Sequence, residues 1–237
     1  MNKNIFRAYD IRGHAENDLN SSTIKKIGYV LGLRVRENNS DSIFVGHDSR
    51  LSCEEIKNNL ITGINAASVK VIDLGLVPTP IIYYATKVGI TSNGVMITGS
   101  HNPKEDNGLK MVIDGNAISG TEIKESVENL TELPINPKKI VEYLDLNKKY
   151  IHEIANKIKI DKKLKVVLDG GNGAAGILAD EMFNALGVEV VSINKEPDGN
   201  FPNHHPDPSK ENNLTDLKKQ INILSADIGF AFDGDGD

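Results

Sequence analysis

Three aspartates at alternate positions in the stretch FDGDGD, residues 232–237, have a spacing that suits a metal site. The apolar run before them predicts a buried strand, and the intervening glycines let the backbone fold tightly. Three carboxylates that face one another repel unless a cation lies between them, and Mg²⁺ is a hard divalent ion that oxygen ligands favour. We therefore interpret Asp233, Asp235 and Asp237 as candidate metal ligands.

Other interpretations of this acidic stretch stay open. An EF-hand would need a bidentate glutamate at the twelfth position of its loop, and that position lies past residue 237. An enzyme that forms an aspartyl phosphate would use Asp233, the first acid after the strand, as its nucleophile. A solvated acidic turn is the simplest alternative.

A second reactive group is offered by TGSHNP at 98–103. The run GVMI before it predicts a strand, so Ser100 stands on a tight loop at a strand's carboxyl end, where open α/β sheets bind ligands. Such a serine can act as a nucleophile if a base and an anion-stabilising group are close, and His101 and Lys110 are the local candidates. A serine turn or a helix cap is the structural alternative.

Two further stretches could contact an anion. FRAYDIRG at 6–13 places Arg7 and Arg12 on either side of Tyr9, and an arginine fork suits phosphate or carboxylate oxygens, although plain surface arginines look the same. DGGNGAAG at 169–176 looks like a phosphate-cradling loop but lacks the dinucleotide and P-loop spacings. A structural strand-to-helix turn explains it equally well.

Adjacent histidines, His204 and His205, lie in a stretch rich in proline and asparagine at 196–213. They could bind zinc, but the sequence places no cysteine and no second histidine pair with them, which argues against a zinc site. The composition of this stretch favours a rigid, ordered loop instead.

The elements that must position these residues follow an alternating pattern of short β-rich runs and longer helical runs. This pattern predicts an α/β fold with largely parallel strands. The predicted strands are 42–48, 69–75, 94–100, 188–194 and 227–232. The predicted helices are 53–67, 83–89, 121–130, 145–160 and 178–187. The predicted loops include 76–80 and 132–139, and the stretch 164–176 is predicted to contain a strand, a turn and the start of a helix.

The strand–helix–strand order restarts at residue 164, which indicates a weak internal duplication. We therefore predict two similar domains, 1–150 and 151–237, each with a mixed, largely parallel sheet flanked by helices. The net charge of −6 argues against a nucleic-acid or anionic-membrane partner, and the single cysteine fits a reducing compartment. With no signal-like start and no apolar run near the ~20 residues that span a bilayer, we expect a cytoplasmic protein.

Taken together, these stretches resemble the bacterial phosphomannomutase/phosphoglucomutase group of the α-D-phosphohexomutase superfamily. The resemblance implies a phosphoglucomutase-like fold for the first two domains, with a phosphoserine loop in domain I and a metal-binding loop closing domain II. The matching stretches, in the family's order, are FRAYDIRG (6–13), VPTP (77–80), GVMITGSHNPKEDNGLK (94–110), DGGNGAAG (169–176), DGNFPNHHPDP (198–208) and FAFDGDGD (230–237).

The implied activity is an isomerase that interconverts hexose 1-phosphate and hexose 6-phosphate, of mannose or glucose, through a phosphoserine and a 1,6-bisphosphate. The resemblance assigns the phosphoserine to Ser100 and gives Mg²⁺ four ligands, a Ser100 phosphate oxygen with Asp233, Asp235 and Asp237. The implied activator is glucose 1,6-bisphosphate or mannose 1,6-bisphosphate. The implied partner is a small phosphosugar, and we expect a monomer.

The same resemblance assigns roles around Ser100. Arg12 is expected to steady developing charge, Lys110 to move protons or stabilise charge, and His101 to orient the serine. The residues expected to bind substrate are Arg7, Tyr9 and Asn102.

The family pattern and this sequence differ after the last aspartate. The family pattern continues with an arginine, then a third domain with a sugar-distinguishing loop and a fourth that clamps the distal phosphate. We therefore expect a C-terminally truncated chain with little turnover; a non-catalytic phosphosugar- or metal-binding remnant is the alternative. In GHDSR at 46–50, His47 stands where members often carry arginine, which affects a local contact.

Overall fold

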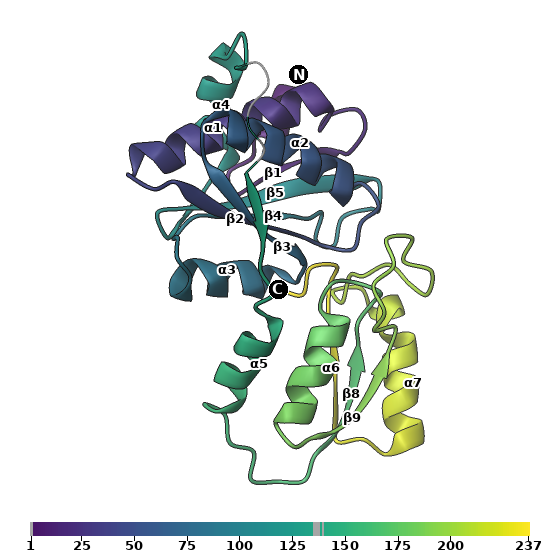
Figure 1. Ribbon diagram of the computed structural model, residues 1–237. Helices are drawn as coiled ribbons and strands as arrows, with labels where there is room; N and C mark the ends of the chain where they lie inside the picture. The colour runs from purple at the N-terminus through teal and green to yellow at the C-terminus, as the bar shows by residue number, and fades with distance from the viewer. Residues whose placement is uncertain (1, 135–137, 139) are drawn as a thin grey trace.

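The protein folds as two α/β units, each with its own sheet, in a computed structural model that describes residues 2–134, 138 and 140–237 (Figure 1). The first unit contains η1 (Lys3–Ile5), β1 (Ile11–His14), α1 (Ser21–Glu37), β2 (Ser42–His47), α2 (Cys53–Ala66), β3 (Lys70–Leu76), α3 (Thr79–Val88), β4 (Gly94–Ile97), β5 (Asp106–Ile113), β6 (Asn116–Ile118), α4 (Gly120–Asn129) and β7 (Val141–Tyr143). The second contains α5 (Asn147–Ala155), β8 (Lys165–Asp169), α6 (Gly176–Ala185), β9 (Glu189–Ile193), η2 (Glu211–Leu214), α7 (Thr215–Leu224) and β10 (Ile228–Ala231).

The first sheet is mixed, in the order β1-β5-β4-β2-β3-β7, with β6 paired to β5. β2 is parallel to β3 and β4, whereas β5 is antiparallel to β4 and β1. Helices α1 and α2 cover one face and α3 the other (Figure 1), so every residue of β2 is buried. Its side chains alternate between two cores, with Ile43 and Val45 in one and Phe44 in the other.

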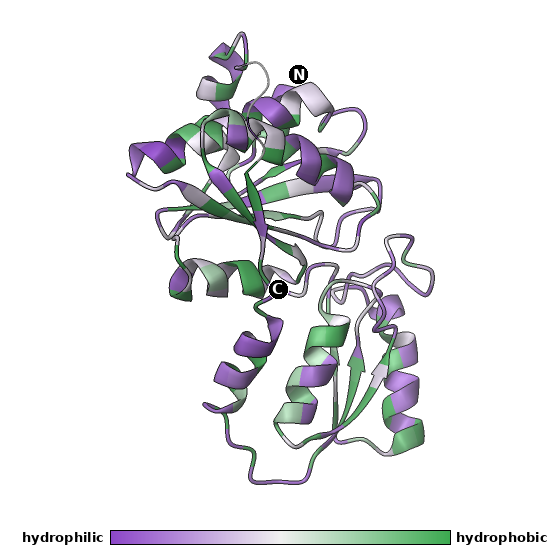
Figure 2. Cartoon of the chain, in the orientation of Figure 1, coloured by the Kyte–Doolittle hydropathy of each residue, from purple (hydrophilic) through white to green (hydrophobic). Residues whose placement is uncertain are grey.

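The second sheet is parallel, with β8 between β10 and β9. The expectation of a buried strand at 227–232 is wrong, because β10 is an edge strand on which Ile228 is 44% and Phe230 39% exposed. Helices α6 and α7 lie on either side of it, and Figure 2 shows hydrophobic residues gathered along β8 and β9. Between the units, α5 contacts both α3 and α6, and Tyr84 meets Tyr150 edge to face with ring centroids 5.1 Å apart. No helix among the described residues is both long and apolar enough to cross a membrane.

The α/β class and the repeated strand–helix–strand unit are confirmed, as β2–α2–β3 in the first unit and β8–α6–β9 in the second. The predicted loop at 76–80 is partly wrong, because α3 already begins at Thr79; Pro80 is accepted in a first helical turn, where its missing N–H has no partner to lose. Helix α5 is shorter than the predicted 145–160. The predicted loop at 132–139 includes 135–137 and 139, which lie outside the described residues.

Candidate functional site

Ser100 lies on the loop after β4, a strand inside the first sheet. Its backbone is in the left-handed region, with φ 50°, and the residue is only 5% exposed. The backbone N–H of Ser100 donates a hydrogen bond to Thr98 Oγ1 at 2.7 Å, which stabilises the turn. The serine therefore stands at the carboxyl end of a buried strand, as its sequence context predicts.

The acidic turn after β10 reaches this serine from the second unit. Asp233 and Asp235 are buried and Asp237 is exposed, and one carboxylate oxygen of each lies within 4.8 Å of the others. The Ser100 hydroxyl donates a hydrogen bond to Asp233 Oδ2 at 2.5 Å, although 133 residues separate them in sequence. A Cβ on Gly234 would lie 2.6 Å from the Ser100 carbonyl oxygen, so glycine permits this approach.

Lys110 and Thr79 hold the rest of the acidic turn against the first unit. The Lys110 ammonium donates to Asp235 Oδ2 and to Asp237 Oδ1, both at 2.8 Å. The Thr79 hydroxyl donates to Asp235 Oδ2 at 2.5 Å, and its backbone N–H donates to the Asp235 carbonyl oxygen at 2.8 Å. The loop interpretation of 76–80 misses Thr79. A threonine directly before a proline signals a helix start near this position, but it does not indicate the contact with Asp235.

Asp233, Asp235 and Lys110 shift one another's pKa values. Burial, and next the negative charge of Asp235, raise the pKa of Asp233 to about 6. Burial also acts to raise the pKa of Asp235, but the Lys110 ammonium lowers it on balance. Burial acts to lower the pKa of Lys110, but Asp235 and then Asp237 raise it on balance. Lys110 therefore stays protonated, and Asp235 stays ionised, at neutral pH.

The acidic turn fits a hard divalent cation. Asp235 Oδ1 is buried and has no hydrogen-bond partner among the described residues. An unpartnered buried carboxylate oxygen is costly, and a cation would satisfy it. The three aspartates and Ser100 offer oxygen ligands, which Mg²⁺ prefers, and the Lys110 ammonium also lies against two of these carboxylates.

Other predicted residues surround the serine loop. His101 Nδ1 lies 3.2 Å from Ser100 Oγ. Arg12, on β1, donates from one terminal nitrogen to Asn102 Oδ1 at 2.7 Å, and its other terminal nitrogen lies 2.8 Å from Asp10 Oδ2. The structure thus brings His101, Arg12 and Asn102 together at the loop of Ser100.

Arg7 and Tyr9 lie between η1 and β1 and are exposed to solvent, Tyr9 at 90%. Their expected contact with a substrate stays a prediction. The glycine-rich stretch 169–176 is a turn between β8 and α6, and the N–H of Ala174 donates to the Gly234 carbonyl oxygen at 3.0 Å. The stretch 169–176 is therefore a structural strand-to-helix turn that holds the acidic turn in place.

Two family profiles match the chain. One is described as phosphoglucomutase/phosphomannomutase, alpha/beta/alpha domain I, over residues 3–134, and the other as domain II of the same family, over residues 148–237. The chain belongs to the phosphoglucomutase/phosphomannomutase family.

Similar proteins of this family are about twice as long. A phosphomannomutase/phosphoglucomutase of Pseudomonas syringae pv. tomato is 46% identical over 98% of this chain and 50% of its own length. A phosphoglucomutase of Neisseria gonorrhoeae is 37% identical over 100% of this chain and 52% of its own. A crystal structure of a phosphoglucomutase/phosphomannomutase family protein from Burkholderia thailandensis superposes with a TM-score of 0.90, at 39% identity, over 99% of this chain and 53% of its own.

In this phosphoglucomutase/phosphomannomutase family member, the two adjacent histidines make separate hydrogen bonds. His204 Nε2 lies 3.0 Å from Asp169 Oδ2 at the end of β8, and His205 Nε2 lies 2.7 Å from the His101 carbonyl oxygen. His204 Nδ1 also lies 2.9 Å from the His205 carbonyl oxygen. The loop is thus ordered by hydrogen bonds, and it ties the second unit to the serine loop.

The pair of Asp169 and His204 predicts a pH dependence of stability. The hydrogen bond to Asp169 raises the pKa of His204 above its ordinary 6.5, with a smaller contribution from Asp216 on α7. Burial acts to raise the pKa of Asp169, but His204 lowers it below 3.8 on balance. The stabilisation is therefore lost as pH rises above 6.5 through the pKa of His204, and as pH falls below 3.8 through that of Asp169.

We expect His204→Gln to lower the free energy of unfolding by about 1–2 kcal/mol more at about pH 5.5 than at about pH 9. Urea unfolding followed by circular dichroism measures this difference. His152→Gln, at an exposed histidine on α5, is the control and should show no such difference. An equal effect of His204→Gln at both pH values would contradict the charged pairing.

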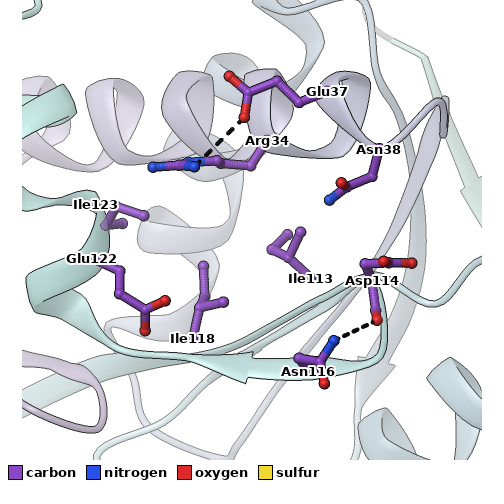
Figure 3. A pocket seen from close by; sticks show the side chains of 9 residues that line it. All are labelled: Arg34, Glu37, Asn38, Ile113, Asp114, Asn116, Ile118, Glu122 and Ile123. Carbon is purple, nitrogen blue, oxygen red and sulfur yellow. Dashed lines mark hydrogen bonds and ion pairs between the residues drawn. The ribbon is translucent and has the colours of Figure 1, made fainter.

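A recess in this family member opens beside the acidic turn, with a volume of about 460 Å³. Its lining comes from both units and includes His101, Asp207, Asp233 and Asp237. Figure 3 shows a different hollow, between the end of α1, the β5–β6 hairpin and α4. Its volume is about 410 Å³. Its arginine, Arg34, is paired with Glu37 at 3.6 Å, and its lining shares no residue with the recess.

Proposed function

We propose that these 237 residues form the phosphoserine-bearing and metal-binding part of a phosphohexomutase, which interconverts hexose 1-phosphate and hexose 6-phosphate of glucose or mannose. Family membership supports this proposal. The observation that carries it is the 2.5 Å hydrogen bond between Ser100 Oγ and Asp233 Oδ2, because it joins a nucleophile to a cation site.

The proposed reaction transfers a phosphoryl group from phosphorylated Ser100 to a hydroxyl of a hexose phosphate. The hexose oxygen attacks phosphorus, the bond between phosphorus and Ser100 Oγ breaks, the attacking hydroxyl loses its proton and Oγ gains one. The product is a hexose 1,6-bisphosphate. Return of its other phosphate to Ser100 completes the interconversion, so glucose 1,6-bisphosphate or mannose 1,6-bisphosphate is the activator that loads the serine.

The surrounding side chains have distinct proposed roles. The raised pKa of Lys110 favours stabilisation of negative charge over proton abstraction, because its ammonium stays protonated between two carboxylates. His101 orients the Ser100 hydroxyl from 3.2 Å. Arg12 Nε is buried without a hydrogen-bond partner among the described residues, so it has a donor left for a phosphate oxygen.

Asp233, Asp235 and Asp237 are the proposed Mg²⁺ ligands, together with an oxygen of the Ser100 phosphate. When bound, Mg²⁺ neutralises charge on the group in transfer. Asp235 fixes the position of the turn, because Lys110 and Thr79 both donate to it. We propose that the hexose phosphate enters from the recess beside Asp233, with Asn102, Arg7 and Tyr9 as substrate contacts on the first unit.

A two-part experiment tests the proposal. The chain is incubated with glucose 1,6-bisphosphate and Mg²⁺, and phosphate on Ser100 is measured by peptide mass spectrometry. A coupled assay on glucose 1-phosphate, with the same activator, measures turnover. We expect Ser100 to gain one phosphate, and turnover to be at least about 100-fold below that of the Pseudomonas syringae relative, which has about twice the length.

Each part has an outcome that contradicts it. Absence of phosphate on Ser100 would leave a phosphosugar- or metal-binding protein and would overturn the proposed transfer. Turnover equal to that of the relative would contradict the expected weak activity of these 237 residues.

A further inference from the structure

Arg50 is a buried arginine next to the serine loop and has no role in the proposed phosphoryl transfer itself. It lies between β2 and α2, in GHDSR, and is 2% exposed. A buried guanidinium is costly unless all of its N–H groups find acceptors. The partners that satisfy Arg50 therefore indicate what it does.

All five N–H groups of the Arg50 guanidinium have an acceptor, and four of the acceptors are backbone carbonyl oxygens of one loop. That loop is the segment 100–106, which carries Ser100. The acceptors are Asp48 Oδ2 at 3.2 Å and the carbonyl oxygens of Ser100 at 2.7 Å, Asn102 at 2.8 Å, Pro103 at 2.5 Å and Asp106 at 2.9 Å.

Asp48 extends this support to the residues just before the serine. Its Oδ2 accepts hydrogen bonds from the Thr98 hydroxyl at 2.8 Å and from the Gly99 N–H at 3.3 Å. A Cβ on Gly99 would lie 2.4 Å from Arg50 Cζ, so the guanidinium lies directly against the loop backbone. Asp48 and Arg50 thus hold the loop on both sides of Ser100.

The second unit covers the same guanidinium. The ring of Phe201 lies with its centroid 5.6 Å from Arg50 Cζ, at cation–π distance, and Phe201 is 8% exposed. From the same loop, His205 Nε2 lies 2.7 Å from the His101 carbonyl oxygen. The segment 201–205 therefore contacts both Arg50 and the loop that Arg50 holds.

We infer that Arg50 is a positioning residue that fixes the Ser100 loop in the geometry needed for phosphoryl transfer, and that Phe201 couples this geometry to the second unit. The role rests on the proposed function. Lysine cannot replace Arg50, because an ammonium has three N–H donors and no planar fork, so at least two of the five acceptors lose their donor.

The test compares Arg50→Lys with Arg34→Lys, which changes a partly exposed arginine on α1 that pairs with Glu37. Two readouts are measured on the full chain: hydrogen exchange of peptides covering 98–106, and the initial rate of Ser100 phosphorylation by glucose 1,6-bisphosphate. For Arg50→Lys we expect exchange in 98–106 to rise about 10-fold or more, with peptides of β8 and β9 unchanged, and phosphorylation to slow about 100-fold. Arg34→Lys should match wild type in both.

Phe201→Leu provides a second variant if Arg50→Lys fails to fold, with Phe183→Leu on α6 as its control. We expect Phe201→Leu to raise exchange in 98–106 and to slow phosphorylation about 10-fold. Unchanged exchange in 98–106, or an equal rise across both units, would overturn the positioning role. If the wild-type chain gains no phosphate, the proposed function fails. The hydrogen-exchange measurement still shows whether Arg50 holds the loop 98–106 in place.

Discussion

Replacing Ser100 with alanine is expected to abolish phosphate uptake from glucose 1,6-bisphosphate. The hydroxyl is the proposed phosphate acceptor, and it is held 2.5 Å from Asp233 on a loop whose backbone conformation is uncommon for serine. Alanine keeps the loop and removes the acceptor oxygen. The phosphorylated fraction, measured by intact-mass spectrometry, should fall about 10³-fold, to the limit of detection.

Ser92→Ala is a matched control, since this serine lies before β4 and outside the candidate site. It should take up phosphate like wild type. Phosphate that persists in Ser100→Ala and is released by hydroxylamine would identify an acyl phosphate. That outcome would favour Asp233 as the nucleophile and contradict the assignment to Ser100.

Replacing Asp235 with asparagine is expected to weaken Mg²⁺ binding about 100-fold or more. Asp235 is fully buried, and one of its oxygens has no hydrogen-bond partner among the described residues. Asparagine keeps the shape and an acceptor for Lys110 and Thr79, but removes the negative charge that attracts the cation. Isothermal titration of the chain with magnesium chloride measures the change.

Thermal unfolding gives an independent measure of the same site. At about 100 times its dissociation constant, Mg²⁺ should stabilise the wild-type chain by about 3 kcal/mol, and this increment should fall to about 0.4 kcal/mol or less in Asp235→Asn at the same concentration. Asp216→Asn, a change on α7 outside the acidic turn, should keep the full stabilisation by Mg²⁺. An Asp235→Asn chain that binds Mg²⁺ like wild type would contradict the metal site.

The parts of the site that sequence could predict are those with a local signal. Ser100 comes shortly after one apolar strand, and Asp233 comes shortly after another apolar strand. Both residues can therefore be placed at the carboxyl ends of strands from the sequence alone. The parallel βαβ units are predictable for the same reason, because their strands are short runs rich in Val, Ile and Leu that are bounded by turns.

The residues that sequence reasoning missed act through tertiary contacts. Thr79 and Arg50 each contact a segment that is distant in sequence, and no spacing rule indicates which distant oxygen a side chain will reach. The antiparallel strands β1 and β5 were also missed, since their pairing is fixed by the sheet as a whole. Helix α5 ends earlier than predicted because helix boundaries depend on packing more than on propensity.

The contact between Ser100 and Asp233 spans 133 residues, and this has a consequence for synthesis on the ribosome. At about 5–20 residues per second, roughly 7–27 s pass between translation of the serine and of its aspartate. In that interval the first unit can fold with its hydroxyl facing water and without the acidic turn. A nascent chain is therefore unable to accept phosphate at this serine by the proposed route until the second unit has emerged and docked.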